Sequence, residues 1–306
     1  MPFAGETIAV ITVLCWTISV QLFGAATRRV GSTPVNIIRL GVALLLFCGL
    51  LLVRDGRLFA HDFPWHSWLL LSLSGAVGFF IGDIFLFKAL AELGPRLAML
   101  VQSLAAPAAA VIGWLFLAES YGCWQWLGIG VTLAGVALVI LERSAPAAAG
   151  QGGARLATAH GVLCGLVGML GQAAGMVLSK AGMQNGSGGY LDAFAATQIR
   201  AMAAFGCFVL FFAVSGRWGY VGRAFADTRA LLYTVSGALF GPFLGVSLAL
   251  LSLHYLSSGV ASTFFSLVPV TIIPFAVFLH KERVSARAVL GALVAVCGVI
   301  LLARRG

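Results

Sequence analysis

The sequence predicts an all-α polytopic membrane protein, and two observations carry that prediction. Hydrophobic residues make up 60% of the 306 and charged residues only 9%, and the mean hydropathy is +1.02. Apolar runs of roughly 18 residues or more, long enough to cross a hydrocarbon core about 30 Å thick, recur along the whole chain. We therefore expect ten transmembrane helices, near residues 6–27, 35–53, 67–91, 96–118, 123–141, 158–180, 192–214, 230–254, 258–280 and 285–303.

The rest of the composition argues against several classes of function. The net charge of +9 comes from basic residues that mostly flank the apolar runs, where they meet headgroups, so no nucleic acid is expected as a partner. The six cysteines have no CxxC or Cys/His spacing, and we expect no metal and no cofactor. The five histidines lie near the ends of runs, and no HExxH, phosphate loop or GxSxG motif occurs. The sequence therefore does not predict an enzyme.

The chain divides into two similar halves. A low-complexity stretch separates five predicted spans from five more, which predicts a first repeat over 1–143, a linker over 144–157 and a second repeat over 158–306. The two halves of the sequence can be aligned with one constant shift in residue number near the third, fourth and fifth spans. Near the second span, a slightly shorter shift aligns them. The constant shift pairs Gly82 with Gly245, Glu119 with Glu282, Gly128 with Gly291 and Gly135 with Gly298, and the shorter shift pairs Arg39 with Arg200.

An odd number of spans in each repeat fixes their relative orientation. A five-span unit returns the chain to the opposite side of the membrane, so the second copy is inserted upside down with respect to the first. Inverted repeats of this kind are typical of secondary transporters, whose substrate site lies near the midplane between the halves. The sequence therefore predicts alternating access around a central cavity.

Three features repeat in both halves and resemble the drug/metabolite transporter superfamily in its ten-span EamA form. They are a proline within each fourth span (Pro107 and Pro269), a glutamate that closes it (Glu119 and Glu282), and the spaced glycines of each fifth span. The resemblance implies a cavity lined by the first, third and fourth spans of each half. It also implies a metabolite cargo, such as aromatic or branched amino acids, sugar phosphates or nucleotide sugars. Cytoplasmic termini are implied too, whereas the positive-inside count places the termini outside.

Asp83 is the most informative candidate residue. It lies within FFIGDIFLFKALAEL, about sixteen residues from one end of its predicted span and eight from the other. An ionisable group at that depth costs a few kcal/mol unless it faces protein or a water-filled cavity. Asp83 is therefore predicted either to contact the substrate or to join two helices by a hydrogen bond.

Other polar and aromatic side chains on the expected cavity-lining spans are further candidates. Glutamines offer both donors and acceptors to a zwitterion, and aromatic rings pack against apolar groups. For the serines, a bond to their own helix is the competing interpretation. The predicted substrate-binding residues are Asp83, Trp16, Gln21, Gln102, Ser103, Gln172, Ser262, Phe265 and Ser266, with Ser247 a further polar candidate. Possible charge or gating residues are Lys88, which has Glu92 four residues on, Arg200, Gly241 and Gly245.

The predicted function is export of small metabolites, with large neutral or aromatic amino acids favoured, by uniport or weakly coupled transport. The alternative is a proton-coupled antiporter of drugs or of sugar- or nucleotide-related metabolites. We expect a monomer in the inner or plasma membrane, with the cargo and the lipid bilayer as its partners.

Overall fold

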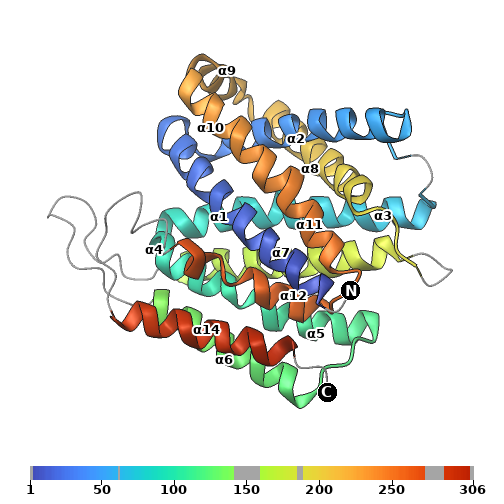
Figure 1. Cartoon of the computed structure of the whole chain (residues 1–306). Coiled ribbons are helices and arrows are strands. Elements are labelled where there is room, and N and C mark those ends of the chain that lie inside the picture. The colour runs from blue at the N-terminus through green and yellow to red at the C-terminus, as the bar shows by residue number, and fades with distance from the viewer. Residues whose placement is uncertain (1–2, 61–62, 141–158, 185–188, 273–285, 304–306) are drawn as a thin grey trace, which may run out of the picture. The chain divides into compact units, whose positions relative to one another are not determined.

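A computed structural model describes residues 3–60, 63–140, 159–184, 189–272 and 286–303, and within these ranges the chain forms helices but no strand (Figure 1). The helices before the predicted linker are α1 (Ala4–Val30), α2 (Ser32–Asp55), α3 (Trp65–Ser74), the π-helix η1 (Gly75–Gly82), α4 (Asp83–Ser103), α5 (Ala105–Leu117) and α6 (Cys123–Ile140). Those after it are α7 (Ala159–Met183), α8 (Ala193–Ser215), α9 (Trp218–Ala226), α10 (Thr228–Ala238), the π-helix η2 (Leu239–Gly245), α11 (Val246–Ser252), α12 (Ser258–Phe265) and α14 (Ala286–Ala303).

Seven helical segments of the described chain are long and apolar enough to cross a membrane. Three shorter apolar helices, Cys123–Val139, Ser258–Ile272 and Val289–Leu302, lie where the fifth, ninth and tenth spans are predicted. Part of the predicted ninth span, with Glu282, lies outside the described residues. The structure therefore agrees with a multi-pass membrane protein, and the count of ten spans stays a prediction.

The helices form two compact units, which differ from the two halves of the sequence. Unit 1 comprises Met1–Ile81 and Ala174–Leu256, and unit 2 comprises Gly82–Ala173 and Ser257–Gly306. Each unit thus combines helices from both sides of the predicted linker. The boundaries fall at the end of η1, within α7, and between α11 and α12.

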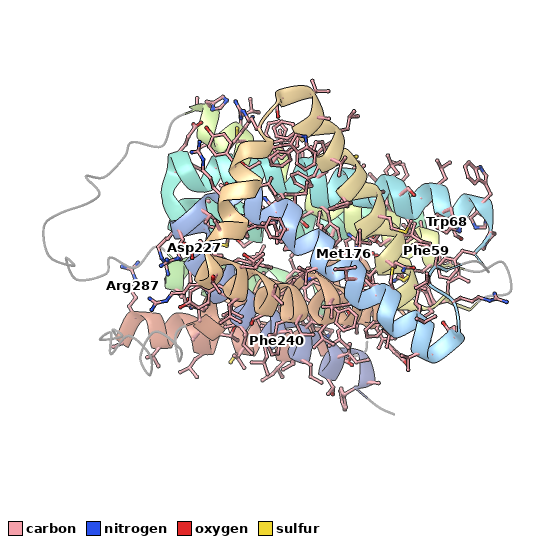
Figure 2. The ribbon with its side chains drawn as sticks, turned by 90° about the horizontal axis from the view of Figure 1, so that it is seen from above. Phe59, Trp68, Met176, Asp227, Phe240 and Arg287 are labelled. Carbon is pink, nitrogen blue, oxygen red and sulfur yellow. The ribbon has the colours of Figure 1, made fainter. Side chains whose placement is uncertain are left out.

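In unit 1, α1 packs along α10 and η2, and α2 and α3 both pack on α8 (Figure 1). The contact with α1 is close because small residues line it: Ser19 donates a hydrogen bond of 3.0 Å to the carbonyl oxygen of Gly237. An ion pair lies at one end of the unit, where Figure 2 shows Asp227, opposite Phe59 and Trp68. Asp227 pairs with Arg29 at 2.8 Å and caps the first turn of α10 through the amide of Ala230.

In unit 2, α6 and α14 lie side by side and are held together by glycines (Figure 1). A Cβ added to Gly128 would lie 2.9 Å from the carbonyl oxygen of Gly298, and one added to Gly291 would lie 2.9 Å from the carbonyl oxygen of Gly135. No side chain fits at either point, so the backbones themselves are in contact, as is typical of membrane helix pairs.

Several predicted helices are interrupted in the structure. The third predicted span is α3, η1 and the start of α4, and the eighth is α10, η2 and α11. The predicted connection after the third span is helical, because α4 continues through Pro95 and ends at Ser103. The fourth predicted span is also interrupted, at Leu104 between α4 and α5, three residues before Pro107. Pro107 itself lies in the first turn of α5, where its missing N–H removes no helical hydrogen bond.

One helix lies where the sequence predicts only a connection. The short α9 follows α8, and its Trp218, Tyr220 and Phe225 are exposed beside Arg223. Arg223 lies over the Tyr220 ring, 5.6 Å from its centroid. Aromatic rings next to cationic side chains on a short amphipathic helix are typical of the membrane–water interface.

Alanine at Gly135 should destabilise the protein, whereas alanine at Gly130 should not. A Cβ at Gly135 would collide with the backbone of Ala295, which has no room to move away, while nothing lies within 4 Å of a Cβ at Gly130. We expect Gly135→Ala to lower the free energy of unfolding by about 1–3 kcal/mol. Gly130→Ala should be neutral or stabilising, because alanine is the better helix former. Thermal unfolding in detergent measures both, and equal midpoints for the two variants would contradict the packing described for α6 and α14.

Candidate functional site

Asp83 begins α4 and is almost completely buried in unit 2, with 6% of its surface exposed. The Nε2 atom of Gln172 on α7 donates a hydrogen bond of 3.0 Å to its Oδ1. Both residues were singled out in the sequence, and the structure brings them together. An amide donor satisfies a carboxylate without adding a second charge, so the pair can lie within the membrane at a lower cost than an isolated ion.

The close approach of α7 to α4 explains why these two side chains meet. Gly168 precedes Gln172 by one turn, and a Cβ there would lie 2.9 Å from the amide nitrogen of Leu86. Gly165, a further turn away, faces Ala89 and Val101 in the same manner. Glycines one and two turns before Gln172 thus bring the helix axes close enough for its amide to reach Asp83.

The second half of α7 makes a polar seam in unit 1 that the sequence analysis missed. The hydroxyls of Ser74 and Ser179 lie 2.7 Å apart, and both bond to the carbonyl oxygen of Gly175. A Cβ at Gly175 would lie 2.9 Å from the Cα of Gly78 in η1. Lys180, which is 6% exposed, donates a hydrogen bond of 2.7 Å to the carbonyl oxygen of Leu256. The spacing of four residues between Gly175, Ser179 and Met183 was the sequence signal that could have predicted this helix face.

Glu119, the glutamate that closes the fourth predicted span, caps the first turn of α12. Its carboxylate accepts hydrogen bonds of 3.0 Å from the backbone N–H and from the hydroxyl of Ser258. Tyr121 donates to Glu119 at 2.5 Å and accepts a hydrogen bond of 3.0 Å from the amide of Gly259. The unsatisfied amides at a helix N-terminus favour negative charge, so these two side chains fix the end of α5 to the start of α12.

The protonation of Tyr121 suits this arrangement. Burial of its phenol is the main cause that raises the pKa of Tyr121 well above its ordinary value, and the hydrogen bond to the Glu119 carboxylate adds to that effect. The hydroxyl therefore keeps its proton at physiological pH and remains a donor to Glu119.

Two of the predicted serines bond to their own helices. The hydroxyls of Ser103 and Ser266 each donate a hydrogen bond of 2.7 Å to the carbonyl oxygen three residues earlier, at Leu100 and Thr263. The helix breaks at these serines, since α4 ends at Ser103, shortly before Pro107, and α12 ends at Phe265, directly before Ser266 and shortly before Pro269. Both serines therefore stabilise a helix interruption, whether or not they also meet a substrate.

The other candidates of unit 2 differ in burial. Ser262 and Phe265 are buried within α12, whereas Gln102 is half-buried. The Gln102 Oε1 atom is buried and has no hydrogen-bond partner among the residues described. Lys88 is exposed and lies over the Phe85 ring, 5.0 Å from its centroid.

A contact between Glu92 and His160 ties α4 to α7. The Oε1 atom of Glu92 lies 2.7 Å from the Nδ1 atom of His160. The sequence had suggested Lys88, four residues earlier on the same helix, as the side chain next to Glu92.

In unit 1, aromatic rings cover the predicted gating residues. The half-buried Trp16 lies against Gly245, and Ser19 and Phe23 lie against Gly241, so that no side chain fits at either glycine. The Arg200 guanidinium is buried over the Phe79 ring, 4.5 Å from its centroid. A cation over an aromatic face is stabilised by the ring quadrupole, which lowers the cost of burial.

Gln21 and Ser247 complete the predicted set. Gln21 is half-buried on α1, and Ser247 is fully buried on α11. The hydroxyl of Ser247 has no hydrogen-bond partner within the described chain. Among those same residues, no group of three or more His, Cys, Asp or Glu side chains is arranged to hold a metal ion.

The multi-pass helical fold agrees with the family to which the sequence is similar. The chain matches the EamA-like transporter family over residues 3–141 and 159–304. It therefore belongs to the EamA-like transporter family, within the drug/metabolite transporter superfamily, whose members are membrane transporters of small solutes and in general not enzymes.

Comparison with solved structures shows the same fold. A crystal structure described only as that of a protein aligns over 100% of both chains with a TM-score of 0.76 and 18% sequence identity. In total, 28 chains of solved structures match. No curated protein sequence matches the chain.

Removal of the Glu119 carboxylate should weaken the start of α12. Glu119→Ala leaves the amide of Ser258 without its acceptor, and loss of an N-terminal cap costs about 1 kcal/mol, within a range of roughly 0.5–2. Amide hydrogen exchange of residues 258–261 should become about five-fold faster. Ser120→Ala, which changes an exposed neighbour, is the control, and equal exchange rates in the two variants would contradict the cap.

Proposed function

We propose that this protein exports small metabolites, and specifically amino acids with large neutral or aromatic side chains, by alternating access. The observation that supports this proposal is the buried carboxylate of Asp83, held by the Gln172 amide inside a membrane span. A carboxylate at that depth can receive the ammonium group of an amino acid, and a neighbouring amide can bond to the other polar groups of a zwitterion.

Alternating access is supported by signs of an inverted duplication. In unit 2, Gly128 faces Gly298 and Gly135 faces Gly291. The constant shift between the repeats pairs Gly128 with Gly291 and Gly135 with Gly298, so exchanging the two repeats turns one contact into the other. A reciprocal contact of this kind is the signature of a two-fold axis between antiparallel helices. Ser103 and Ser266, which the constant shift also pairs, make the same hydrogen bond to their own helices. An axis that inverts one repeat onto the other is the usual basis of alternating access.

Uniport or weakly coupled export fits the distribution of carboxylates. Within the described residues, Asp83 is the carboxylate that lies deepest in a span; Glu6 and Asp55 lie at helix ends, and Glu119 lies in a connection. The hydrogen bond that Asp83 accepts from the neutral amide of Gln172 suits a cargo-binding role. We place the protein in the inner or plasma membrane as a monomer, with the cargo and lipid as its partners.

A proton-coupled antiporter of drugs or of sugar- or nucleotide-related metabolites is the second candidate. The observation in its favour is again Asp83, because a buried carboxylate within a membrane can carry a proton across it. The two candidates differ in what drives uptake and in what Asp83 binds.

Transport by purified protein in liposomes separates the two candidates. We expect wild-type protein to take up radiolabelled phenylalanine and leucine at the same rate with and without a pH gradient. Asp83→Asn keeps the hydrogen-bonding capacity towards Gln172 but loses the charge, so we expect the KM to rise at least ten-fold, about 1.4 kcal/mol of lost binding.

Asp227→Asn is the matched control, because Asp227 lies outside the predicted spans in an exposed ion pair. It should transport as the wild type does. Uptake that requires a pH gradient and is lost in Asp83→Asn would favour the antiporter, and no uptake of any amino acid tested would refute the proposed cargo.

A further inference from the structure

The two π-helices of the chain lie at the same position of the predicted repeat. η1 ends at Gly82 and η2 at Gly245, and the constant shift between the repeats superposes these two glycines. A π-helix is rare and commonly arises where one extra residue is inserted in an α-helix, often at a functional site. Neither segment is marked by a motif, so their common register is information that the structure adds.

Each π-helix is anchored by the same aromatic contact. In unit 1, the ring of Phe80 in η1 lies 4.9 Å from that of Phe208 on α8, and the ring of Phe243 in η2 lies 5.0 Å from that of Phe47 on α2. The constant shift pairs Phe80 with Phe243, and the shorter shift of the second span pairs Phe47 with Phe208. Phe47 and Phe208 are both completely buried. The two segments therefore have equivalent fixed partners.

A second side of each π-helix makes a close contact through an equivalent glycine. Gly78 of η1 lies against Gly175 of α7, and its equivalent in η2, Gly241, lies against Ser19 and Phe23 of α1. The glycine-to-glycine contact of η1 leaves few side-chain atoms to resist a rotation, whereas the aromatic contact of each segment holds one point of it in place. This combination suits a segment that changes its helical register.

The residues that follow the two π-helices differ in chemistry. Asp83 follows η1 directly, and the constant shift makes Val246 its equivalent after η2.

The residues that contact these positions differ as well. The separation in sequence between Ser19 and Gly175 is the same as that between Trp16 and Gln172, so Trp16 and Gln172 hold equivalent positions on α1 and α7. The Gln172 amide thus bonds to Asp83 in one copy, while Trp16 packs on Gly245 in the other. Only the first copy couples a π-helix to a charge.

We propose that η1 is a register switch that sets the orientation of Asp83, and that η2 is its uncharged counterpart. An α-helix turns by about 100° and rises 1.5 Å per residue. An α-helical turn holds about one residue fewer than a π-helical turn. Conversion of η1 from π to α therefore rotates α4 by about 100° relative to η1, and Asp83 moves away from Gln172. The proposal rests on the proposed function only for the use of Asp83 in transport, because the switch itself needs no cargo.

The test is amide hydrogen exchange on the purified full-length protein in lipid nanodiscs without cargo. A segment that interconverts between π and α opens its hydrogen bonds more often than a stable helix. We expect residues 75–82 and 239–245 to exchange at least ten-fold faster than the flanking turns at 67–74 and 246–252. If both segments exchange as slowly as their flanks, the proposal is wrong.

Two matched substitutions identify the contact that holds each segment. Gln172→Leu removes the hydrogen bond to Asp83, and we expect exchange in 75–82 to rise at least three-fold with no change in 239–245. Trp16→Leu should do the reverse. A uniform rise in both segments for either variant would indicate general loosening of the fold and would overturn the assignment of Gln172 to η1.

Deletion of Ile81 tests the register directly, because it restores an α-helical count through η1. We expect exchange in 75–82 to fall to the rate of its flanks and phenylalanine uptake to be lost, while exchange in 239–245 is unchanged. Unaltered exchange in a folded deletion variant would overturn the switch. If the deletion variant does not fold, the wild-type and Gln172→Leu measurements still decide. If wild type moves no amino acid but shows the expected exchange, the proposed cargo fails and the switch stands.

Discussion

Close contact between helix backbones at small residues is the interaction on which the rest of the structure depends. Lipid tails are as apolar as leucine side chains, so hydrophobicity does not drive one membrane helix against another. What brings the helices together is the packing that becomes available where a side chain is missing, as between Gly135 and Gly291 or at Gly168 against α4. These contacts in turn decide which polar groups meet. Gln172 reaches Asp83 because Gly168, one turn away, lets α7 approach.

The second requirement is that polar groups inside the protein find partners, and the chain meets it with few charges. Asp83 is bonded to an amide, Lys180 to a carbonyl oxygen and Glu119 to the backbone amide of Ser258 at the start of α12. In each case a group that would be costly in hydrocarbon also joins two segments that are distant in the sequence. The same side chains therefore contribute to both the fold and the candidate transport chemistry.

Much of the fold follows from the sequence, because length and apolarity are the properties that a bilayer selects. The apolar helices, the repeated glycines and, as one of two alternatives, a hydrogen bond from Asp83 to another helix were predicted from residue patterns. The membership of the EamA-like family then came from motifs such as that of Glu119, and the comparison confirms it. The amino-acid cargo, the site residues and the ten-span count remain predictions.

Other features of the structure could not be predicted from the sequence, for identifiable reasons. A π-helix adds one residue to a turn, and in a segment such as GAVGFFIG, which is apolar on every face, no periodic pattern records the change. The cap of α12 by Glu119 joins residues 139 positions apart, and no local rule relates them. The interfacial α9 was missed because it is short, although Trp218, Tyr220 and Arg223 carry its signature.

The proposed transport chemistry depends on Asp83 receiving the ammonium group of the cargo. Competition against bound radiolabelled phenylalanine on wild-type protein tests it most directly, with phenethylamine, which lacks the carboxylate, and 3-phenylpropanoate, which lacks the ammonium group. We expect phenethylamine to displace phenylalanine at concentrations where 3-phenylpropanoate does not. Displacement by 3-phenylpropanoate alone would show that the protein recognises the carboxylate instead, and would contradict the role assigned to Asp83.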